Sequence, residues 1–139
     1  MKAAKETFGK TERLCSNKII KSLFEQGNII HNSCFKVVWG IPSSPIPSPA
    51  QVAFSVSRKG FRHAVTRNLL KRRIREAYRK NKQILYNYLE TEHIEVAIVI
   101  ILKGTEILDY FTLEKSIRDI LNKLIFQIKE KQNRMLKLL

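Results

Sequence analysis

The chain has 139 residues, 44% of them hydrophobic, so it is long and apolar enough for one domain with a buried core and is not a disordered tail. Its formal net charge of +14 costs self-repulsion unless an anionic partner neutralises it, which points to nucleic acid or an anionic membrane surface. The arginine and asparagine content of the most basic segment favours nucleic acid.

Neither the N-terminus nor any apolar run indicates a membrane protein. Residues 1–6 contain no apolar h-region, and the longest apolar run, 96–102, is too short to span a bilayer. Cys15 and Cys34 have no paired spacing and no histidine cluster beside them, so we expect two free thiols and no zinc site. A reducing cytoplasm is the expected compartment, without membrane association.

The N-terminal part is expected to be an arm, residues 1–14, followed by a helix. Ser16 can cap this helix, which runs to about Gln26, and Gly27 supplies its C-terminal stop. The apolar residues of this segment recur at helical spacing: Ile19, Ile20, Leu23 and Phe24.

Three strands are expected next, at 28–30, 34–39 and 51–57. In the second strand the side chains alternate between an apolar face, with Phe35, Val37 and Trp39, and a mixed face. The third strand has a face of small residues, which leaves room for a ligand to lie on it. Four prolines and three serines in 41–50 predict an exposed connection between strands and not a domain boundary, so residues 1–139 are expected to form a single domain.

The segment 66–79 is predicted to be a helix with one cationic and one apolar face. At about 100° per residue, Leu70, Ile74 and Ala77 share one flank, and the strongest donors share another. Glu76 is the only acid in the window 58–82, which holds eleven of the 26 lysines and arginines. Because such crowded charge destabilises a free helix, an anionic partner is expected.

A central strand covered on both faces is expected at 95–102, since this segment is apolar and β-branched throughout. Thr112 can then cap a long helix with a wide apolar stripe, which we interpret as core packing; a partner-binding coiled coil is the alternative. The stripe consists of Leu113, Ile117, Ile120, Leu121, Leu124, Ile125 and Ile128.

The segment 56–79 resembles the signature of the bacterial ribonuclease P protein subunit. That signature is a valine-rich strand, a Lys/Arg pair, and then the groups Arg-Asn-Arg, Lys-Arg and Arg-Glu-Ala-aromatic-Arg in that order, and the segment from Arg67 to Arg79 contains these residues at every position but one. Phe8, with Arg13-Leu14 five and six residues later, looks like the N-terminal motif of that family. The resemblance covers essentially the whole chain in element order.

One position departs from the signature, because Leu69 stands where the family has arginine. On the helical wheel Leu69 lies beside the densest cationic face, and Arg73 follows one turn later on nearly the same line. We therefore hypothesise that Arg73 supplies the missing charge.

The resemblance implies an α+β fold in the order α-β-β-β-α-β-α, with a four-stranded mixed sheet and a left-handed βαβ crossover (ribosomal protein S5 domain 2-like). General rules favour a right-handed crossover, so this handedness rests on the resemblance alone.

The function implied is that of the protein subunit of ribonuclease P, an endoribonuclease that removes the 5′ leader from precursor tRNA. The catalytic centre of that enzyme belongs to its RNA, an M1-type RNA, which holds Mg²⁺. No catalytic residue, dedicated metal site or obligate protein partner is therefore expected in this chain. The acidic residues are scattered along the sequence and form no carboxylate cluster of the kind that holds two metal ions, which is consistent with this expectation.

Two surfaces are implied for the two RNA partners. The residues expected to bind the catalytic RNA, mainly through phosphates, are Arg58, Lys59, Arg62, His63, Arg67, Asn68, Lys71, Arg72, Arg73, Arg75 and Arg79. The residues matching the family's cleft for the single-stranded leader are Phe8, Lys10, Arg13, Ile20, Phe24, Lys36, Val38 and Ser55.

Several of these assignments have structural alternatives. Phe24 can stack a base or pack in the core. Val38 stands where other members carry an aromatic residue, so it offers apolar contact only. His31 and His93 are expected to have surface or packing roles, whereas His63 lies among cations and is a candidate RNA contact.

Three other functions fit parts of the pattern. A ribosomal or other structural RNA-binding protein would use the same charge and helix. A helix-turn-helix DNA-binding module would need a helix, not a strand, before the basic helix. A self-sufficient nuclease would cleave without RNA.

Overall fold

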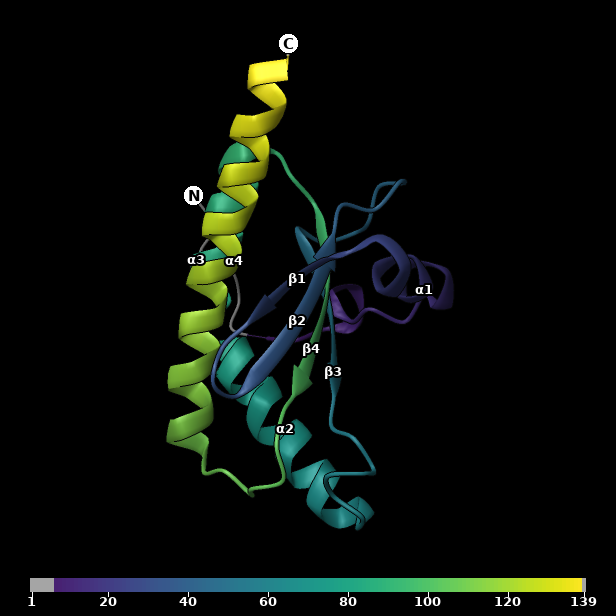
Figure 1. Ribbon diagram of the computed structural model, residues 1–139, viewed down its shortest axis with the longest axis vertical. Helices are drawn as coiled ribbons and strands as arrows, with labels where there is room; N and C mark the ends of the chain where they lie inside the picture. Colours follow the sequence, from purple (N-terminus) through teal and green to yellow (C-terminus); the bar gives the residue numbers. More distant parts are fainter. Residues whose placement is uncertain (1–6, 139) are drawn as a thin grey trace.

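The computed structural model describes residues 7–138 (Figure 1). The α+β class and the predicted element order are confirmed, with one addition, because a further helix follows the basic helix. The elements are a 3-10 turn η1 (Lys10–Glu12), α1 (Asn17–Gln26), β1 (Asn28–His31), β2 (Phe35–Gly40), β3 (Ala50–Ser55), α2 (Ala64–Asn81), α3 (Gln83–Glu92), β4 (Val96–Leu102) and α4 (Tyr110–Leu138).

The four strands form one mixed sheet in the order β1-β2-β4-β3. β1 and β4 both pair antiparallel with β2, whereas β3 pairs parallel with β4. A parallel pair cannot be joined by a tight turn, so α2 and α3 form the crossover between β3 and β4. The basic helix is therefore held against the sheet by the two strands that flank it in the sequence.

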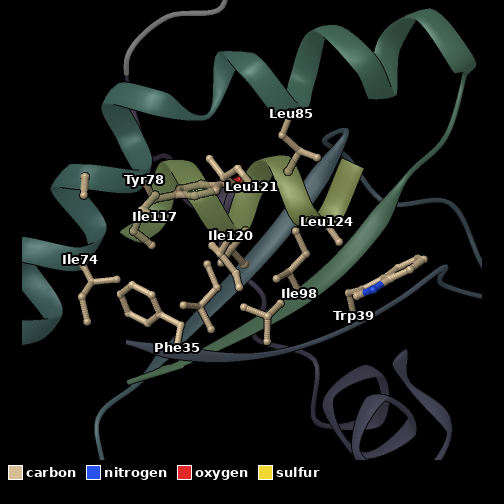
Figure 2. Close-up of a cluster of buried hydrophobic side chains, with 14 of the residues drawn as sticks. Phe35, Trp39, Ile74, Tyr78, Leu85, Ile98, Ile117, Ile120, Leu121 and Leu124 are labelled. Carbon is tan, nitrogen blue, oxygen red and sulfur yellow. The ribbon is translucent and has the colours of Figure 1, made fainter. Parts of the chain in front are cut away.

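Three helices and the sheet enclose the main core (Figure 2). The predicted apolar face of β2 is confirmed, because Phe35, Val37 and Trp39 are each at most 1% exposed. Ile98 and Ile100 of β4 lie in the same cluster, and α2, α3 and α4 cover it. The apolar stripe of α4 belongs to this core, as predicted, and only Ile125 of that stripe is partly exposed.

The opposite face of the sheet carries α1 and a smaller apolar cluster. Leu23 of α1 packs there with Val38 of β2 and Val99 of β4. The predicted ends of α1 are confirmed: the Ser16 side chain accepts a hydrogen bond from the Ile19 amide (3.3 Å), and Gly27 ends the helix. A Cβ at Gly27 would lie 2.8 Å from Cγ1 of Val38, so glycine lets the end of α1 approach β2.

Two expectations about helices need correction. α4 begins at Tyr110 rather than with Thr112 as the cap, because Oδ1 of Asp109 accepts a hydrogen bond from the Thr112 amide (2.8 Å) and caps the helix instead. Helix α3 was not expected at all; its C-cap is His93, which adopts a left-handed conformation with φ of 56°.

Cys15 and Cys34 are free thiols, as predicted. Within residues 7–138, no helix combines the length and apolarity that crossing a membrane requires.

A buried ion pair fixes the described part of the N-terminal arm, residues 7–14, to the junction of α2 and α3. The rest of the predicted arm, residues 1–6, lies outside the described residues. Nζ of Lys82 donates to Oε1 of Glu12 and to the carbonyl oxygen of Thr7, and the hydroxyl of Tyr86 donates to Oε1 of Glu12 (2.6 Å). Burial alone would raise the pKa of Glu12, but the hydrogen bonds from Lys82 and Tyr86 outweigh it and hold that pKa below 4.5. The Gly9 amide donates to the other carboxylate oxygen (2.9 Å). The pair therefore determines where the arm leaves the core.

We predict that Glu12→Gln lowers the free energy of unfolding by about 3 kcal/mol at neutral pH, because Lys82 then keeps a buried charge without a counter-ion. The pKa of Glu12 is lowered by folding, so its contribution is complete above about pH 4.5 and declines as the pH falls further. Urea denaturation of both proteins between pH 3 and 7 measures the difference. The control is Glu12→Gln/Lys82→Met, which removes both charges and should be more stable than Glu12→Gln alone. Equal stability of the two variants at neutral pH would show that Glu12 is not the counter-ion of a buried Lys82 charge.

Candidate nucleic-acid interface

Burial of one flank of α2 determines where its cations point. Leu70, Ile74 and Ala77, the predicted apolar flank, are at most 1% exposed, and Tyr78 is also buried. The flank packs against α4 and the sheet (Figure 2). Since the helix cannot rotate without exposing this flank, the side chains on its opposite side are held towards solvent.

The loop between β3 and α2 is held against the start of the helix. Phe61 is buried, and its amide donates to the carbonyl oxygen of Ser57 (3.1 Å). Nη1 of Arg67 donates to the carbonyl oxygens of Phe61 (2.8 Å) and Arg62 (2.9 Å). A Cβ at Gly60 would lie 2.9 Å from the carbonyl oxygen of Gly104, so glycine allows the loop to approach the end of β4. Arg67, predicted to bind RNA, thus has a structural role in positioning this loop.

The loop and α2 together present what we call the basic surface: Arg58, Lys59, Arg62, His63, Asn68, Lys71, Arg72 and Arg75. All are exposed except Lys71, which is half-buried. In the part of the chain that the structure describes, none of these side chains donates to a protein acceptor or pairs with an acid. The first turn of α2 contains no acid, so the helix dipole adds to the positive potential there. This surface is suited to bind phosphates, and binding of RNA by these residues stays a prediction.

Like Arg67, two further predicted RNA-binding arginines have partners within the protein. Arg73 is half-buried, and its Nη1 donates to the carbonyl oxygen of Leu108 (2.7 Å), which ties α2 to the loop before α4. Arg79 pairs with Glu76 through two hydrogen bonds (3.0 and 2.6 Å) and lowers the pKa of that carboxyl group. The geometry therefore gives no support to the hypothesis that Arg73 replaces the arginine missing at Leu69.

A second exposed surface lies on the α1 side of the sheet. The strand register places His31, Lys36, Ile101 and Ser55 side by side across β1, β2, β4 and β3. Val38 and Val99, two residues along β2 and β4 on the same face, are buried beneath α1, whereas the row itself is exposed or half-buried. We call this row, with Ala53 beside it, the open sheet face.

The predicted leader-binding residues divide into two groups. Lys36 and Ser55 lie on the open sheet face, and Ile20 and Phe24 lie on α1 above the same side of the sheet. The Phe24 ring is 57% exposed, so its core-packing alternative is wrong. Val38 is only 2% exposed under α1, which leaves it almost no surface for a leader.

The N-terminal motif lies elsewhere than expected. The Phe8 ring packs edge-on against Phe54 (5.5 Å between centroids) and Tyr78 (5.8 Å), on the α2 side of the sheet, so its assignment to the leader cleft is wrong. Lys10 and Arg13 are exposed beside β3, where Arg13 forms a parallel bridge with Val52. They lie along one edge of the sheet.

The sequence did not reveal that His31, Ala53 and Ile101 share the open sheet face. The signal was present only as strand alternation, which indicates faces within one strand but not the register between strands. His63 caps α2 without a side-chain hydrogen bond and stays exposed at the basic surface.

The remaining titratable groups indicate packing rather than chemistry. Burial, followed by a hydrogen bond to Glu114 (2.8 Å), raises the pKa of Tyr110 to about 12 at the contact between α2 and α4. Within residues 7–138, no group of three or more His, Cys, Asp or Glu side chains is arranged so that it could hold a metal ion. A cavity of about 890 Å³ lies between the 41–49 loop and the end of α3 and includes no residue of either surface.

The fold and its two surfaces define a small, basic α+β protein with a cationic helix and an open sheet face. The family model for ribonuclease P matches residues 8–125, and this chain belongs to that family. The "Ribonuclease P protein component" of Porphyromonas gingivalis is 34% identical over 114 residues, which is 81% of this chain and 83% of that protein. The protein of the same description from Petrotoga mobilis is 32% identical over 122 residues, which is 86% of this chain and 96% of that protein.

Solved structures show the same fold. The ribonuclease P protein of Thermotoga maritima matches with a TM-score of 0.65 and 24% identity, over 81% of this chain and 96% of that one. A Staphylococcus aureus ribonuclease P protein matches with a TM-score of 0.63 and 21% identity, over 81% and 94%.

Arg73 and Arg75 provide a matched test of the basic surface, since they lie two residues apart on α2. We predict that Arg75→Ala reduces the slope of log affinity for the RNA subunit against log salt by about 0.7 to 0.9, because one phosphate contact is lost. Arg73→Ala should leave the slope unchanged and lower the free energy of unfolding by about 1 to 2 kcal/mol, since a hydrogen bond is lost. Filter binding at several salt concentrations and urea denaturation measure both. A reduced slope for Arg73→Ala together with an unchanged slope for Arg75→Ala would contradict this assignment and place Arg73 on the RNA.

Proposed function

We propose that this chain is the protein subunit of ribonuclease P and assists a catalytic RNA in removing the 5′ leader from precursor tRNA. Membership of the family over residues 8–125 is the observation that carries the proposal. The exposed cations of the basic surface support it, because they require an anionic partner and have no counter-ions within residues 7–138.

The basic surface docks on the RNA subunit, an M1-type RNA. Guanidinium groups of Arg72 and Arg75 make charge-assisted hydrogen bonds with phosphates, while Asn68 and Lys71 add contacts along the same face. Because the buried flank of α2 and the Arg67 contacts fix the backbone of this surface in advance, little backbone or loop ordering opposes binding. Docking of this kind recognises backbone shape rather than base sequence.

The open sheet face holds the single-stranded leader. Phe24 stacks a base, Lys36 meets a phosphate, and Ser55 leaves space because it is small. Base stacking and phosphate contact tolerate many sequences, which suits an enzyme that processes many precursors. The protein thereby increases the affinity for precursors over that for mature tRNA, and broadens the substrate range.

Chemistry belongs to the RNA, which holds the Mg²⁺ ions. The chain contributes position and charge neutralisation, and it works in the cytoplasm without an obligate protein partner. Cleavage of precursor tRNA by the RNA subunit at low Mg²⁺, with and without this protein, tests the function. We expect the protein to increase kcat/KM; no change would leave a structural RNA-binding role, and cleavage without the RNA would indicate a nuclease.

For the open sheet face, we predict that Phe24→Ala weakens binding of a precursor with a leader of several nucleotides about fivefold or more, since one stacked base is lost. Binding of mature tRNA to the same holoenzyme should not change. Phe111→Ala is the control, because this ring is 77% exposed at the start of α4, which covers the other face of the sheet. Equal losses for both tRNAs would argue that Phe24 supports the fold and does not touch the leader.

A further inference from the structure

The last turns of α4, residues 126–138, lie outside the segment 8–125 that the family model matches. We call them the α4 extension. They project beyond the sheet at one end of the molecule (Figure 1). Beyond Ile128 every residue of the extension is exposed except Gln132, which is half-buried. Core packing therefore does not account for the residues after Ile128.

The α4 extension is strongly basic. It contains one acid, Glu130, and four cations: Lys129, Lys131, Arg134 and Lys137. Within residues 7–138 none of the four cations has an acidic side chain within ion-pair distance, unlike Arg118 and Lys123 of the same helix, which pair with Glu114 and Asp119. The charge of the extension is thus unneutralised.

Contacts with the body hold the base of the extension in place. Nζ of Lys129 lies 5.2 Å from the ring centroid of Tyr88, and Nζ of Lys131 lies 5.7 Å from that of Trp39. The Tyr88 hydroxyl donates to Oε1 of Gln132. The helix is therefore anchored as far as residue 132, and Arg134 and Lys137 extend from a fixed base.

A groove of about 270 Å³ opens beside Lys131, between the end of α1, the start of β1 and the end of β2. Its polar lining comes from Ser22, Gln26 and Asn28. Hydroxyl and amide groups of this kind bind phosphate and sugar oxygens, and Lys131 adds a charge at the rim.

We propose that the α4 extension is a second docking element for the RNA subunit, in which Lys131, Arg134 and Lys137 contact phosphates. This inference rests on the proposed function. The extension and the start of α2 lie at opposite ends of the long axis of the molecule (Figure 1). α4 alone spans about 43 Å, at about 1.5 Å per residue. A partner that contacts both the basic surface and the extension has to span this length, which suits a large folded RNA better than a short single-stranded leader.

The test is the salt dependence of binding between the full-length protein and the RNA subunit. Lys131→Gln/Arg134→Gln/Lys137→Gln keeps good helix-forming residues and should reduce the log-log slope by about 2. The control, Lys115→Gln/Arg118→Gln/Lys123→Gln, removes the same charge from the first half of α4 and should leave the slope unchanged. Lys137→Gln alone, at the exposed tip where folding is not at risk, should reduce the slope by about 0.7.

An unchanged slope in the triple variant would overturn the inference, as would equal losses in the triple variant and the control. Self-association of the wild-type protein that the triple variant abolishes, with no change in slope, would assign the extension to contacts between copies and would also overturn it. Failure of the proposed function is distinguishable, because the wild-type protein itself would then bind the RNA subunit weakly and with a shallow slope.

Discussion

The burial of one flank of α2 is the constraint on which the rest of the molecule depends. Leu70, Ile74 and Tyr78 are in contact with the core formed by the sheet and α4, and none is more than 1% exposed. Turning the helix would expose several large apolar side chains, at about 1.5 to 3 kcal/mol each. Hydrophobic packing therefore fixes the orientation of the cations. Binding of an anionic partner would reduce the repulsion between them.

The same packing divides the sheet into two faces with different uses. Three helices cover one face, while α1 covers only part of the other and leaves the row from His31 to Ser55 accessible. Because β4 is buried on both faces where α1 lies, the sheet is a rigid support for both surfaces. The buried Glu12–Lys82 pair then connects residues 7–14 to the α2–α3 junction, so that these residues, the basic helix and the sheet form one body.

The elements with strong periodicity could be predicted from the sequence, and those set by long-range contacts could not. The flank of α2 and the apolar face of β2 followed from helical and strand spacing. The position of Phe8 could not, because it depends on where Phe54 and Tyr78 come together. The partner of Arg73 is a backbone carbonyl 35 residues away, which no local pattern indicates. Helix α3 was missed because its apolar residues follow a long basic helix without a glycine or proline between them.

The two surfaces also differ in how far the sequence determines them. The basic surface is contiguous in the chain, so its residues could be named in advance, and only the internal partners of Arg67, Arg73 and Arg79 were unforeseen. The open sheet face is assembled from four strands, and its composition depends on register. Residues such as His31 and Ile101 can therefore be assigned to this face only when the pairing of the strands is known.

The most direct test of the account is directed hydroxyl-radical probing of the RNA subunit from a tethered iron chelate. In a Cys15→Ser background, where Cys34 is buried, single cysteines replace Arg72 on the basic surface and Phe111 at the start of α4. The account predicts strong, localised cleavage of the RNA backbone from position 72 and little from position 111. Cleavage from position 111 with none from position 72 would contradict it.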